Sequence, residues 1–400
     1  MKKTISIIGG GASALILGCE LNSEKYSVSI FEKNSALGRK FLVAGDGGLN
    51  LTHSEDEKDF ILKYSPHQFL QKAFSHFSNK DLVKWINDLG VETFIGSSGR
   101  VFPEKGIKPI DVLNKIEEKI KKNKVVINYK HEWKGFSDNN ELLFKTASGE
   151  KKIKSDLVIF CLGGASWPVT GSKGDWRSLF EIKNTKTIPF QASNCSFKVE
   201  WPKEIMKSIE GKPLKNISIT CENKIHFGEV VLTSFGIEGS GIYPLSPEIR
   251  ESIINSDNAK IVIDLKPQLS SEELLKRISN TKTKLSYTEN ITNQLNLNKT
   301  HLALIKSKMN KNDFLDPAKF VNNLKNFEIH ISELGPIEDA ISTVGGISLN
   351  EISEQFELKK IKNNFVIGEM LDYDAPTGGY LLQSCFSMGK FLADHLNDLH

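Results

Sequence analysis

The sequence predicts an α/β protein in which both ends of the chain build a Rossmann-like parallel sheet and a second domain is inserted between them. Three observations lead to this fold class. Residues 5–8 form an apolar strand that runs into a glycine turn and then into a helical segment. Residues 364–369 repeat this design near the C-terminus, before a helical pattern at 381–397. The region between them has alternating β-like stretches followed by polar helical ones, which is typical of an insertion.

The N-terminal strand and turn carry the pattern of a dinucleotide-binding motif. Gly9 permits the tight turn, and Gly11 lacks a side chain, so the backbone can approach a pyrophosphate. Ala14 stands where glycine is common and lets the helix pack close to the strand. The second strand, 28–31, ends at Glu32, at the distance expected for a carboxylate that binds ribose hydroxyls. The alternative is a chance glycine turn, and the second strand argues against it.

The remaining elements follow from periodicity. Apolar residues at helical spacing predict helices at 12–22, 67–89 and 109–122. Short apolar runs predict strands at 125–127 and 156–162, and residues 142–149 are typical of a β-hairpin. The strand at 156–162 ends in Gly163 and Gly164, which would let the chain pass close to a ligand.

The domain boundaries are expected near residues 187 and 335. Residues 1–186 and 336–400 would form the discontinuous nucleotide-binding domain, and 187–335 the inserted domain. Within the insertion, 187–266 is expected to be β-rich and 267–335 mainly helical. A chain of 400 residues is also too long for one simple core.

Composition indicates a soluble protein without a membrane span. A net charge of +3 implies no strong overall attraction to nucleic acid or to a membrane. The five cysteines form no Cys-x-x-Cys pair, which argues against a zinc site or a disulfide framework and suits a reducing cytosol. We therefore expect a cytoplasmic protein with no metal site. No apolar run approaches the roughly 20 residues that cross a bilayer.

One segment is more basic than the rest of the chain. Residues 271–312 contain eight Lys or Arg and three Asp or Glu, a local charge of +5. A solvated helical face in a lysine-rich protein is the simpler interpretation, and a face that binds RNA or another anion is the alternative.

Six segments point to one family. They are the N-terminal glycine motif, 38–54, 100–103, 162–168, 368–372 and 376–380. Together they resemble the BaiN-like family of bacterial NAD(P)/FAD-dependent flavoproteins, also called aminoacetone-oxidase-like, over nearly the whole chain. The resemblance implies an FAD-binding domain of the glutathione-reductase type. The family that the chain resembles also includes a ribosomal RNA dihydrouridine synthase.

The chain departs from its better known relatives at one place. They carry Arg-Cys-Asn where this chain has Gly48-Leu49-Asn50, so no role of that Arg or Cys is transferred. The acid at Glu32 disfavours a ribose 2′-phosphate, and the resemblance selects FAD over NAD. Arg39 and Lys40 are expected to face the pyrophosphate, with an exposed surface pair as the alternative.

The resemblance also places three segments along the flavin. The loop 45–52 would lie against the ring, and Glu369 against the ribityl chain. Residues 378–380 open the last helix, whose N-terminus would face the pyrimidine edge and stabilise negative charge on the reduced ring. The expected cofactor-binding residues are Gly9, Gly11, Ala12, Ser13, Ala14, Glu32, Lys33, Arg39, Lys40, Gly45, Gly47, Asn50, Thr52, Val126, Gly163, Gly164, Gly368, Glu369, Gly378, Gly379, Tyr380 and Leu381.

The catalytic acid or base is open. Asp46, His53 and Asp372 are candidate proton donors. For His53 a capping or surface role is the alternative, and for Asp372 a solvated carboxylate. Trp167 is expected to fill core rather than stack on the cofactor.

The leading functional prediction is an FAD-dependent oxidoreductase that transfers a hydride between flavin and an unidentified small molecule. NADH or NADPH would serve as a transient electron donor, because the chain has no second dinucleotide motif. The alternatives are a flavin-dependent rRNA dihydrouridine synthase, with structured RNA as partner, and a non-catalytic FAD-binding redox sensor.

Overall fold

The computed structural model describes residues 2–45, 48–279 and 285–399. They form two compact units, one of Met1–Ala192 with Ile341–His400 and one of Ser193–Ala340. Both boundaries lie a few residues beyond the predicted ones. The reason is a two-stranded sheet of β11 (Thr187–Ser193) and β18 (Ser342–Ile347), which pairs the two chain segments at the boundary.

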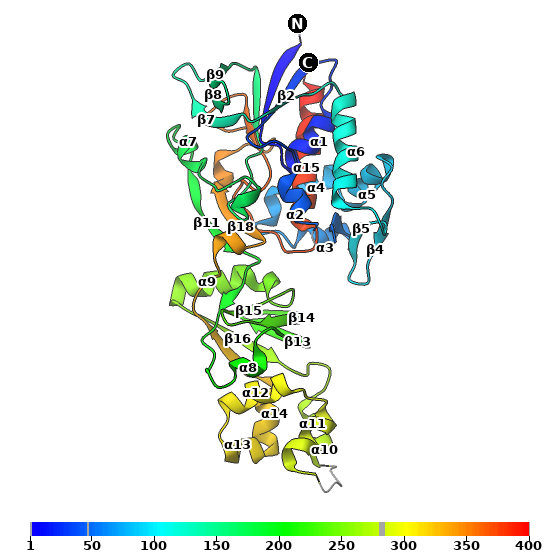
Figure 1. Cartoon of the computed structure of the whole chain (residues 1–400), viewed down its shortest axis with the longest axis vertical. Helices are drawn as coiled ribbons and strands as arrows, with labels where there is room; N and C mark the ends of the chain where they lie inside the picture. The colour runs from blue at the N-terminus through cyan, green and yellow to red at the C-terminus, as the bar shows by residue number, and fades with distance from the viewer. Residues whose placement is uncertain (1, 46–47, 280–284, 400) are drawn as a thin grey trace. The chain divides into compact units, whose positions relative to one another are not determined.

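A five-stranded parallel sheet is the centre of the first unit. Its order is β19-β10-β1-β2-β6, and every neighbouring pair is parallel. This confirms the predicted Rossmann-like fold. The first and last parts of the chain lie side by side in this unit (Figure 1). The strands are β1 (Lys3–Ile8), β2 (Tyr26–Glu32), β6 (Val126–Tyr129), β10 (Leu157–Phe160) and β19 (Asn364–Val366).

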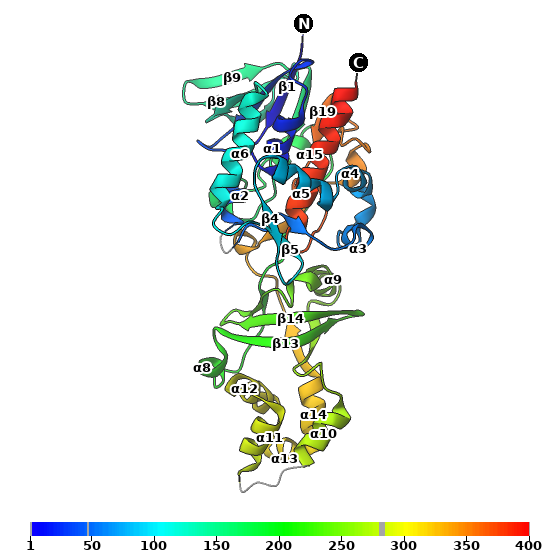
Figure 2. The same cartoon turned by 90° about the vertical axis from the view of Figure 1, so that its right-hand side faces the viewer.

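Two layers cover the sheet. Helices α1 (Ala12–Glu20), α6 (Pro109–Lys122) and α15 (Tyr380–Asp398) pack together on one side (Figure 2). Helices α1 and α15 approach closely because Gly389 has no side chain: a Cβ there would overlap Ile16. An antiparallel meander covers the other side, with Phe144 stacked on Phe31 of β2 at 4.7 Å between ring centroids. The meander strands are β7 (Glu132–Phe136), β8 (Leu142–Thr146) and β9 (Gly149–Ile153).

The predicted helix at 67–89 is interrupted. The structure has a 3-10 turn at His67–Phe69, then α4 (Gln71–His76) and α5 (Asn79–Asp88). Ser78 starts α5 with a capping box, in which its N–H donates to the Asp81 carboxylate at 2.8 Å. The apolar periodicity continues through this break, so periodicity alone predicted one helix.

Short elements complete the first unit. A second small antiparallel sheet has the order β3-β5-β4. The elements are α2 (Arg39–Val43), β3 (Thr52–His53), α3 (Glu57–Ile61), β4 (Thr93–Ile95), β5 (Arg100–Pro103), α7 (Arg177–Glu181) and 3-10 turns at Pro168–Thr170 and Leu349–Glu351.

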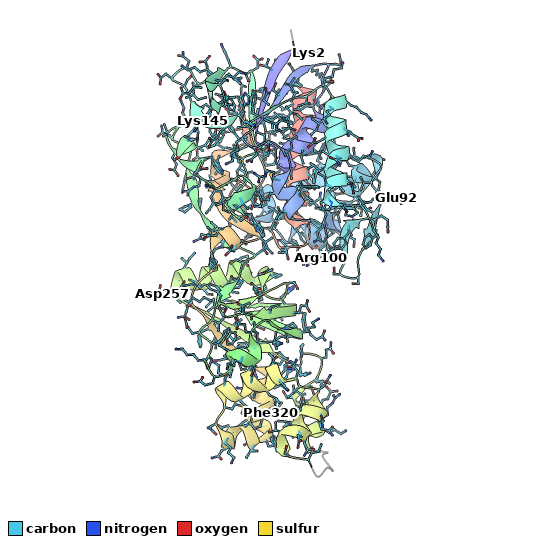
Figure 3. All side chains as sticks on the ribbon, in the orientation of Figure 1. Lys2, Glu92, Arg100, Lys145, Asp257 and Phe320 are labelled. Carbon is cyan, nitrogen blue, oxygen red and sulfur yellow. The ribbon has the colours of Figure 1, made fainter. Side chains whose placement is uncertain are left out.

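The second unit contains a six-stranded antiparallel sheet, followed in the chain by small helices. Its strand order is β12-β15-β14-β13-β16-β17. The strands are β12 (Phe197–Lys198), β13 (Lys212–Cys221), β14 (Lys224–Leu232), β15 (Gly236–Glu238), β16 (Ala259–Asp264) and β17 (Phe327–Ile331). Phe320, labelled in Figure 3, is fully buried in the helical part. The helices are α8 (Met206–Ile209), α9 (Ser246–Ser256), α10 (Ser271–Ser279), α11 (Tyr287–Leu295), α12 (Lys299–Lys308), α13 (Lys311–Leu315) and α14 (Pro317–Lys325), with 3-10 turns at Tyr243–Leu245 and Ile337–Asp339.

His301 should make the second unit sensitive to mild acid. Burial, with a smaller effect from the charge of Lys266, lowers the pKa of His301 from 6.5 to about 4. Between these two values the unfolded chain binds a proton that the folded chain does not. Stability therefore falls as the pH drops from 6.5 toward 4, by up to about 3 kcal/mol.

The variant His301→Gln isolates this effect. His301 Nδ1 accepts the N–H of Asn298 at 3.2 Å in the capping box of α12, and glutamine is a common residue at that position. Urea unfolding at pH 7.5 and 4.5 should show a smaller loss of stability for the variant than for the natural chain. Equal losses would contradict the assignment to His301.

Candidate functional site

The sequence-predicted residues gather at the carboxyl edge of the parallel sheet. The glycine turn 9–11 follows β1, Glu32 ends β2, residues 161–164 follow β10, and residues 367–369 follow β19. In open α/β sheets, ligands bind in the crevice outside this edge.

The two motif glycines have different roles. Gly9 has φ +97°, and a Cβ there would overlap the carbonyl oxygen of Cys161 on the neighbouring strand. Gly11 has an ordinary φ of −81°, and a Cβ there would meet no protein atom within 4 Å. Gly9 is therefore required by the fold, while Gly11 keeps open the space before the N-terminus of α1. An open, positively polarised helix end fits a pyrophosphate.

Glu32 has one acceptor position left for a ligand. Its Oε1 accepts the N–H and the side-chain amide of Asn34, both at 2.8 Å, and its Oε2 accepts the N–H of Gly10 at 2.8 Å. A carboxylate offers about four such positions, so Oε2 keeps one that a ribose hydroxyl can fill. Glu32 is 8% exposed. Lys33, the next residue, is exposed.

Val126 does not belong to this edge. It begins β6 beside Ser29, at the far end of the strand, and is 55% exposed. The residues that face Glu32 are Tyr129 in the strand register and His131, whose N–H donates to the Glu32 carbonyl at 3.0 Å. Parallel strands place ligands at their carboxyl ends, so this position does not support the expected cofactor role of Val126.

Lys40 and Glu369 contact each other. The Lys40 ammonium lies 2.8 Å from Glu369 Oε2 and 2.7 Å from the Ser166 hydroxyl. Arg39 is exposed and donates to Asn34 at 2.9 Å. Gly164 lies against this group, since a Cβ there would overlap the Thr343 hydroxyl. Gly163 and Gly368 both have positive φ, and a Cβ on Gly368 would crowd Ser13 Oγ at 2.5 Å.

The predicted flavin-facing loop contains unused polar atoms. Asn50 Oδ1 and Thr52 Oγ1 are buried and have no hydrogen-bond partner among the described residues. Buried polar atoms normally find partners, so this segment fits a polar cofactor. Leu49, between these residues and the glycines before them, is buried in the core. Asp46 and Gly47 lie outside the described residues, and Gly45 is held against Pro109.

The start of α15 lies beside this loop. Gly378 and Gly379 have φ of +104° and +98°, and a Cβ on Gly379 would lie 2.6 Å from the Cα of Thr52. The Tyr380 hydroxyl donates to the carboxylate of Glu55. Burial, followed by the hydrogen bond to Glu55 and its charge, raises the pKa of Tyr380, while Arg100 opposes this. Arg100, labelled in Figure 3, begins β5, and Leu381 is half-buried.

Neither of the described catalytic candidates is an obvious acid. His53 Nδ1 accepts the N–H of Glu55 at 3.1 Å, so Nε2 carries the proton and donates to the Ser98 carbonyl at 2.9 Å. Both ring nitrogens are thus engaged by backbone, which favours the structural alternative. Asp372 is half-buried, and its N–H donates to the Ile347 carbonyl at 3.0 Å.

Sequence reasoning missed several residues of this site. Asn34 follows Glu32 by two residues and had a local signal, because asparagine side chains commonly bond nearby backbone and side chains in turns. Thr343 and Glu55 act across long sequence separations and had none, while Ser166 lies in the family-like segment 162–168 without having been assigned a role. Trp167 was expected in the core, but it has φ +52° and is 39% exposed.

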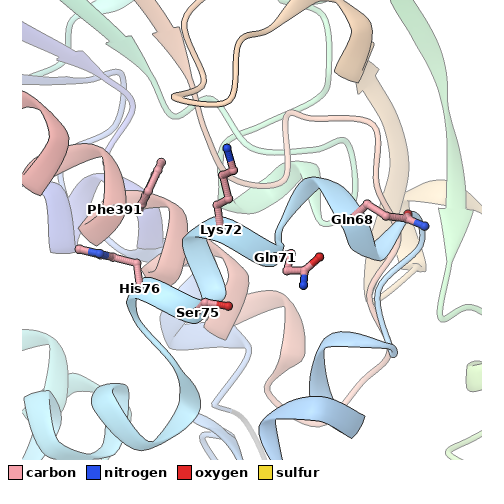
Figure 4. A pocket seen from close by; sticks show the side chains of 6 residues that line it. All are labelled: Gln68, Gln71, Lys72, Ser75, His76 and Phe391. Atoms are coloured by element: carbon pink, nitrogen blue, oxygen red, sulfur yellow. The ribbon is translucent and has the colours of Figure 1, made fainter.

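A shallow hollow of about 650 Å³ lies elsewhere on the unit, over α4 and α15 (Figure 4). His76 Nε2 is bonded there to Asp394 at 2.7 Å, and no hydrogen bond joins Ser75 to His76 among the described residues. The hollow therefore holds no nucleophile paired with a base. Its lining residues are Gln68, Gln71, Lys72, Ser75, His76 and Phe391.

The structure also bears on metal binding, disulfide bonds and membrane spans. Within residues 2–45, 48–279 and 285–399, no three His, Cys, Asp or Glu side chains are grouped as metal ligands. All five cysteines are free and buried. No helix in the described part of the chain combines the length and apolarity that a membrane span needs.

The chain is similar to known proteins over nearly its whole length. The family model described as the HI0933-like protein Rossmann domain matches residues 3–395. A ribosomal RNA dihydrouridine synthase of Haemophilus influenzae is 24% identical over 390 residues, 95% of each chain. A 3-dehydro-bile acid delta(4,6)-reductase of Clostridium scindens is 22% identical over 403 residues, 96% of this chain and 97% of the relative.

A solved structure shows the same fold. The 3-ketosteroid-delta4-(5alpha)-dehydrogenase of Rhodococcus jostii superposes with a TM-score of 0.51 at 11% identity, covering 100% of this chain and 97% of that one. The family match extends over nearly every described element, including both halves of the parallel sheet. The chain belongs to the HI0933-like Rossmann-domain family and is an FAD-dependent oxidoreductase.

Proposed function

We propose that this protein uses FAD to transfer a hydride from NADH or NADPH to a carbon–carbon double bond conjugated with a carbonyl in a small molecule. The observation that carries FAD binding is the open space at Gly11, next to the remaining acceptor position of Glu32. The substrate class is supported by two relatives, whose names both describe reduction of such a bond, in uridine and in a 3-dehydro-bile acid.

Different residues of the site would bind different parts of FAD. The open N-terminus of α1 would hold the pyrophosphate and Glu32 a ribose hydroxyl. Asn50 Oδ1 would accept a hydrogen bond from the cofactor, and the Thr52 hydroxyl would donate or accept one. The N-terminus of the 19-residue helix α15 would stabilise negative charge that develops beside it. Bound FAD would supply the hydride-transfer chemistry itself.

The first experiment is anaerobic reduction of the purified flavoprotein by NADH and, separately, by NADPH. We expect one nucleotide to bleach the visible flavin band within seconds, because the site would place its nicotinamide against the ring. Free FAD with the same nucleotide is the control and should react far more slowly. A yellow protein that neither nucleotide bleaches would exclude the nicotinamide donor and favour reduction by the substrate itself.

RNA is a second candidate substrate. Two observations favour it: the relatives named ribosomal RNA dihydrouridine synthase, and the basic segment at 271–312. In this segment, Lys276, Arg277, Lys299 and Lys311 are exposed and form no ion pair among the described residues. Exposed unpaired lysines and arginines are the usual contacts to phosphate backbones.

Deletion of the gene tests this candidate. If the protein acts on RNA, mass spectrometry should find that one dihydrouridine is missing from the ribosomal RNA of the deletion strain. Restoring the natural chain should return it, and a chain with Lys276 and Arg277 changed to Glu should not. Unchanged dihydrouridine in the deletion strain would end the RNA proposal.

A further inference from the structure

The Lys40 ammonium is bound by two partners within the protein, Ser166 and Glu369. Lys40 Nζ lies 2.7 Å from the Ser166 hydroxyl and 2.8 and 3.1 Å from the two carboxylate oxygens of Glu369. A lysine ammonium has three N–H donors and no more. These contacts direct the ammonium toward Ser166 and Glu369, although the sequence predicts Lys40 at the pyrophosphate.

The carboxylate of Glu369 is enclosed from the other side as well. Glu369 is 7% exposed, and its Oε1 also accepts the N–H of Thr343 at 3.2 Å. The Thr343 hydroxyl in turn accepts the N–H of Ala165 at 3.2 Å. Gly164 completes the enclosure, because a Cβ there would lie 2.9 Å from the carboxylate carbon of Glu369.

These contacts join four segments of the first unit. Lys40 comes from α2, Ser166 from the loop after β10, Glu369 from the loop after β19 and Thr343 from β18. The two loops leave adjacent strands at the edge where the cofactor is proposed to bind. The proposed place of the pyrophosphate is a separate one, in the open space at Gly11.

We propose that Lys40 is a positioning residue, which acts through Glu369 to hold the loops after β10 and β19 in the shape that the flavin half of FAD requires. It does not bind the pyrophosphate. This inference rests on the proposed binding of FAD. Loss of Lys40 would leave a buried carboxylate without its counterion, which is strongly unfavourable and would displace both loops.

ADP separates the two roles of Lys40, because it carries the pyrophosphate and adenosine but no ribityl chain or flavin. The full chain, stripped of flavin, is titrated with FAD and with ADP by calorimetry. We expect Lys40→Met to weaken FAD binding about 10- to 100-fold and to change ADP binding less than about threefold. The control Lys121→Met, which removes an exposed cation of α6, should change both affinities less than about threefold.

A double-mutant cycle tests the route through Glu369. In a Glu369→Gln background, Lys40→Met should change FAD affinity by less than about threefold, because its effect is already lost. Additive losses, or a loss of ADP affinity equal to the loss of FAD affinity, would overturn the proposal. If Lys40→Met alone does not fold, the double variant, which has no unpaired buried charge, is titrated with ADP. Affinity near that of the natural chain supports the proposal, and a large loss overturns it. A natural chain that binds ADP but not FAD would contradict FAD binding itself.

Discussion

An alanine at Gly11 should abolish FAD binding and lower the stability of the protein by no more than about 1 kcal/mol, the cost of alanine at the N-cap of α1. The added Cβ would meet no protein atom within 4 Å, and a φ of −81° is ordinary for alanine. The methyl group would instead enter the space before the first turn of α1, where the pyrophosphate is proposed to lie. We expect FAD affinity, measured by titration of the flavin-free protein, to fall by about 100-fold or more.

The matched control is the same substitution two residues earlier. Gly9→Ala would place a Cβ against the carbonyl of Cys161 and force alanine to φ +97°. It should destabilise the protein by about 3 kcal/mol or more in urea unfolding. Gly11→Ala should therefore lose FAD binding, whereas Gly9→Ala should lose stability of the fold. A Gly11→Ala protein that retains FAD normally would show that the pyrophosphate lies elsewhere.

The local features of the site could be predicted from the sequence. The strand, the glycine turn and Glu32 lie within one short stretch, where spacing fixes their mutual positions. Local reasoning does not show where along β6 a residue lies, and the structure places Val126 at the start of that strand, beside Ser29. Local reasoning also merged α4 and α5, since apolar periodicity continues across the capping serine at Ser78.

Contacts between distant segments could not be predicted in this way. Lys40 follows the glycine motif and is a reasonable phosphate partner by position alone. Only the fold brings it to Glu369, 329 residues away, and thereby pairs its charge. Thr343, which encloses the same carboxylate, has no pattern in the sequence that marks it. A charged residue near a motif can thus be assigned a ligand only after its internal partners are known.

Replacing Glu32 with glutamine should lower both FAD affinity and stability, although the two side chains have the same shape. Three N–H donors converge on the Glu32 carboxylate: two from Asn34 and one from Gly10. Glutamine has one carbonyl oxygen and one NH₂ group, so one of its ends must turn a donor toward another donor. We expect a loss of about 2 kcal/mol of stability, because hydrogen bonds to a charged acceptor are lost in a buried place.

The loss of affinity has a separate cause. If the NH₂ group turns toward Gly10, it replaces the only acceptor position that the carboxylate keeps for a ribose hydroxyl. If it turns toward Asn34, the turn that follows β2 is displaced. Either outcome should weaken FAD about 100-fold, measured on flavin-free protein. The control Glu24→Gln changes a carboxylate that is 76% exposed and should alter neither quantity. Normal FAD binding by Glu32→Gln would mean that the ribose does not depend on this carboxylate, and that Glu32 serves only to fix the glycine turn.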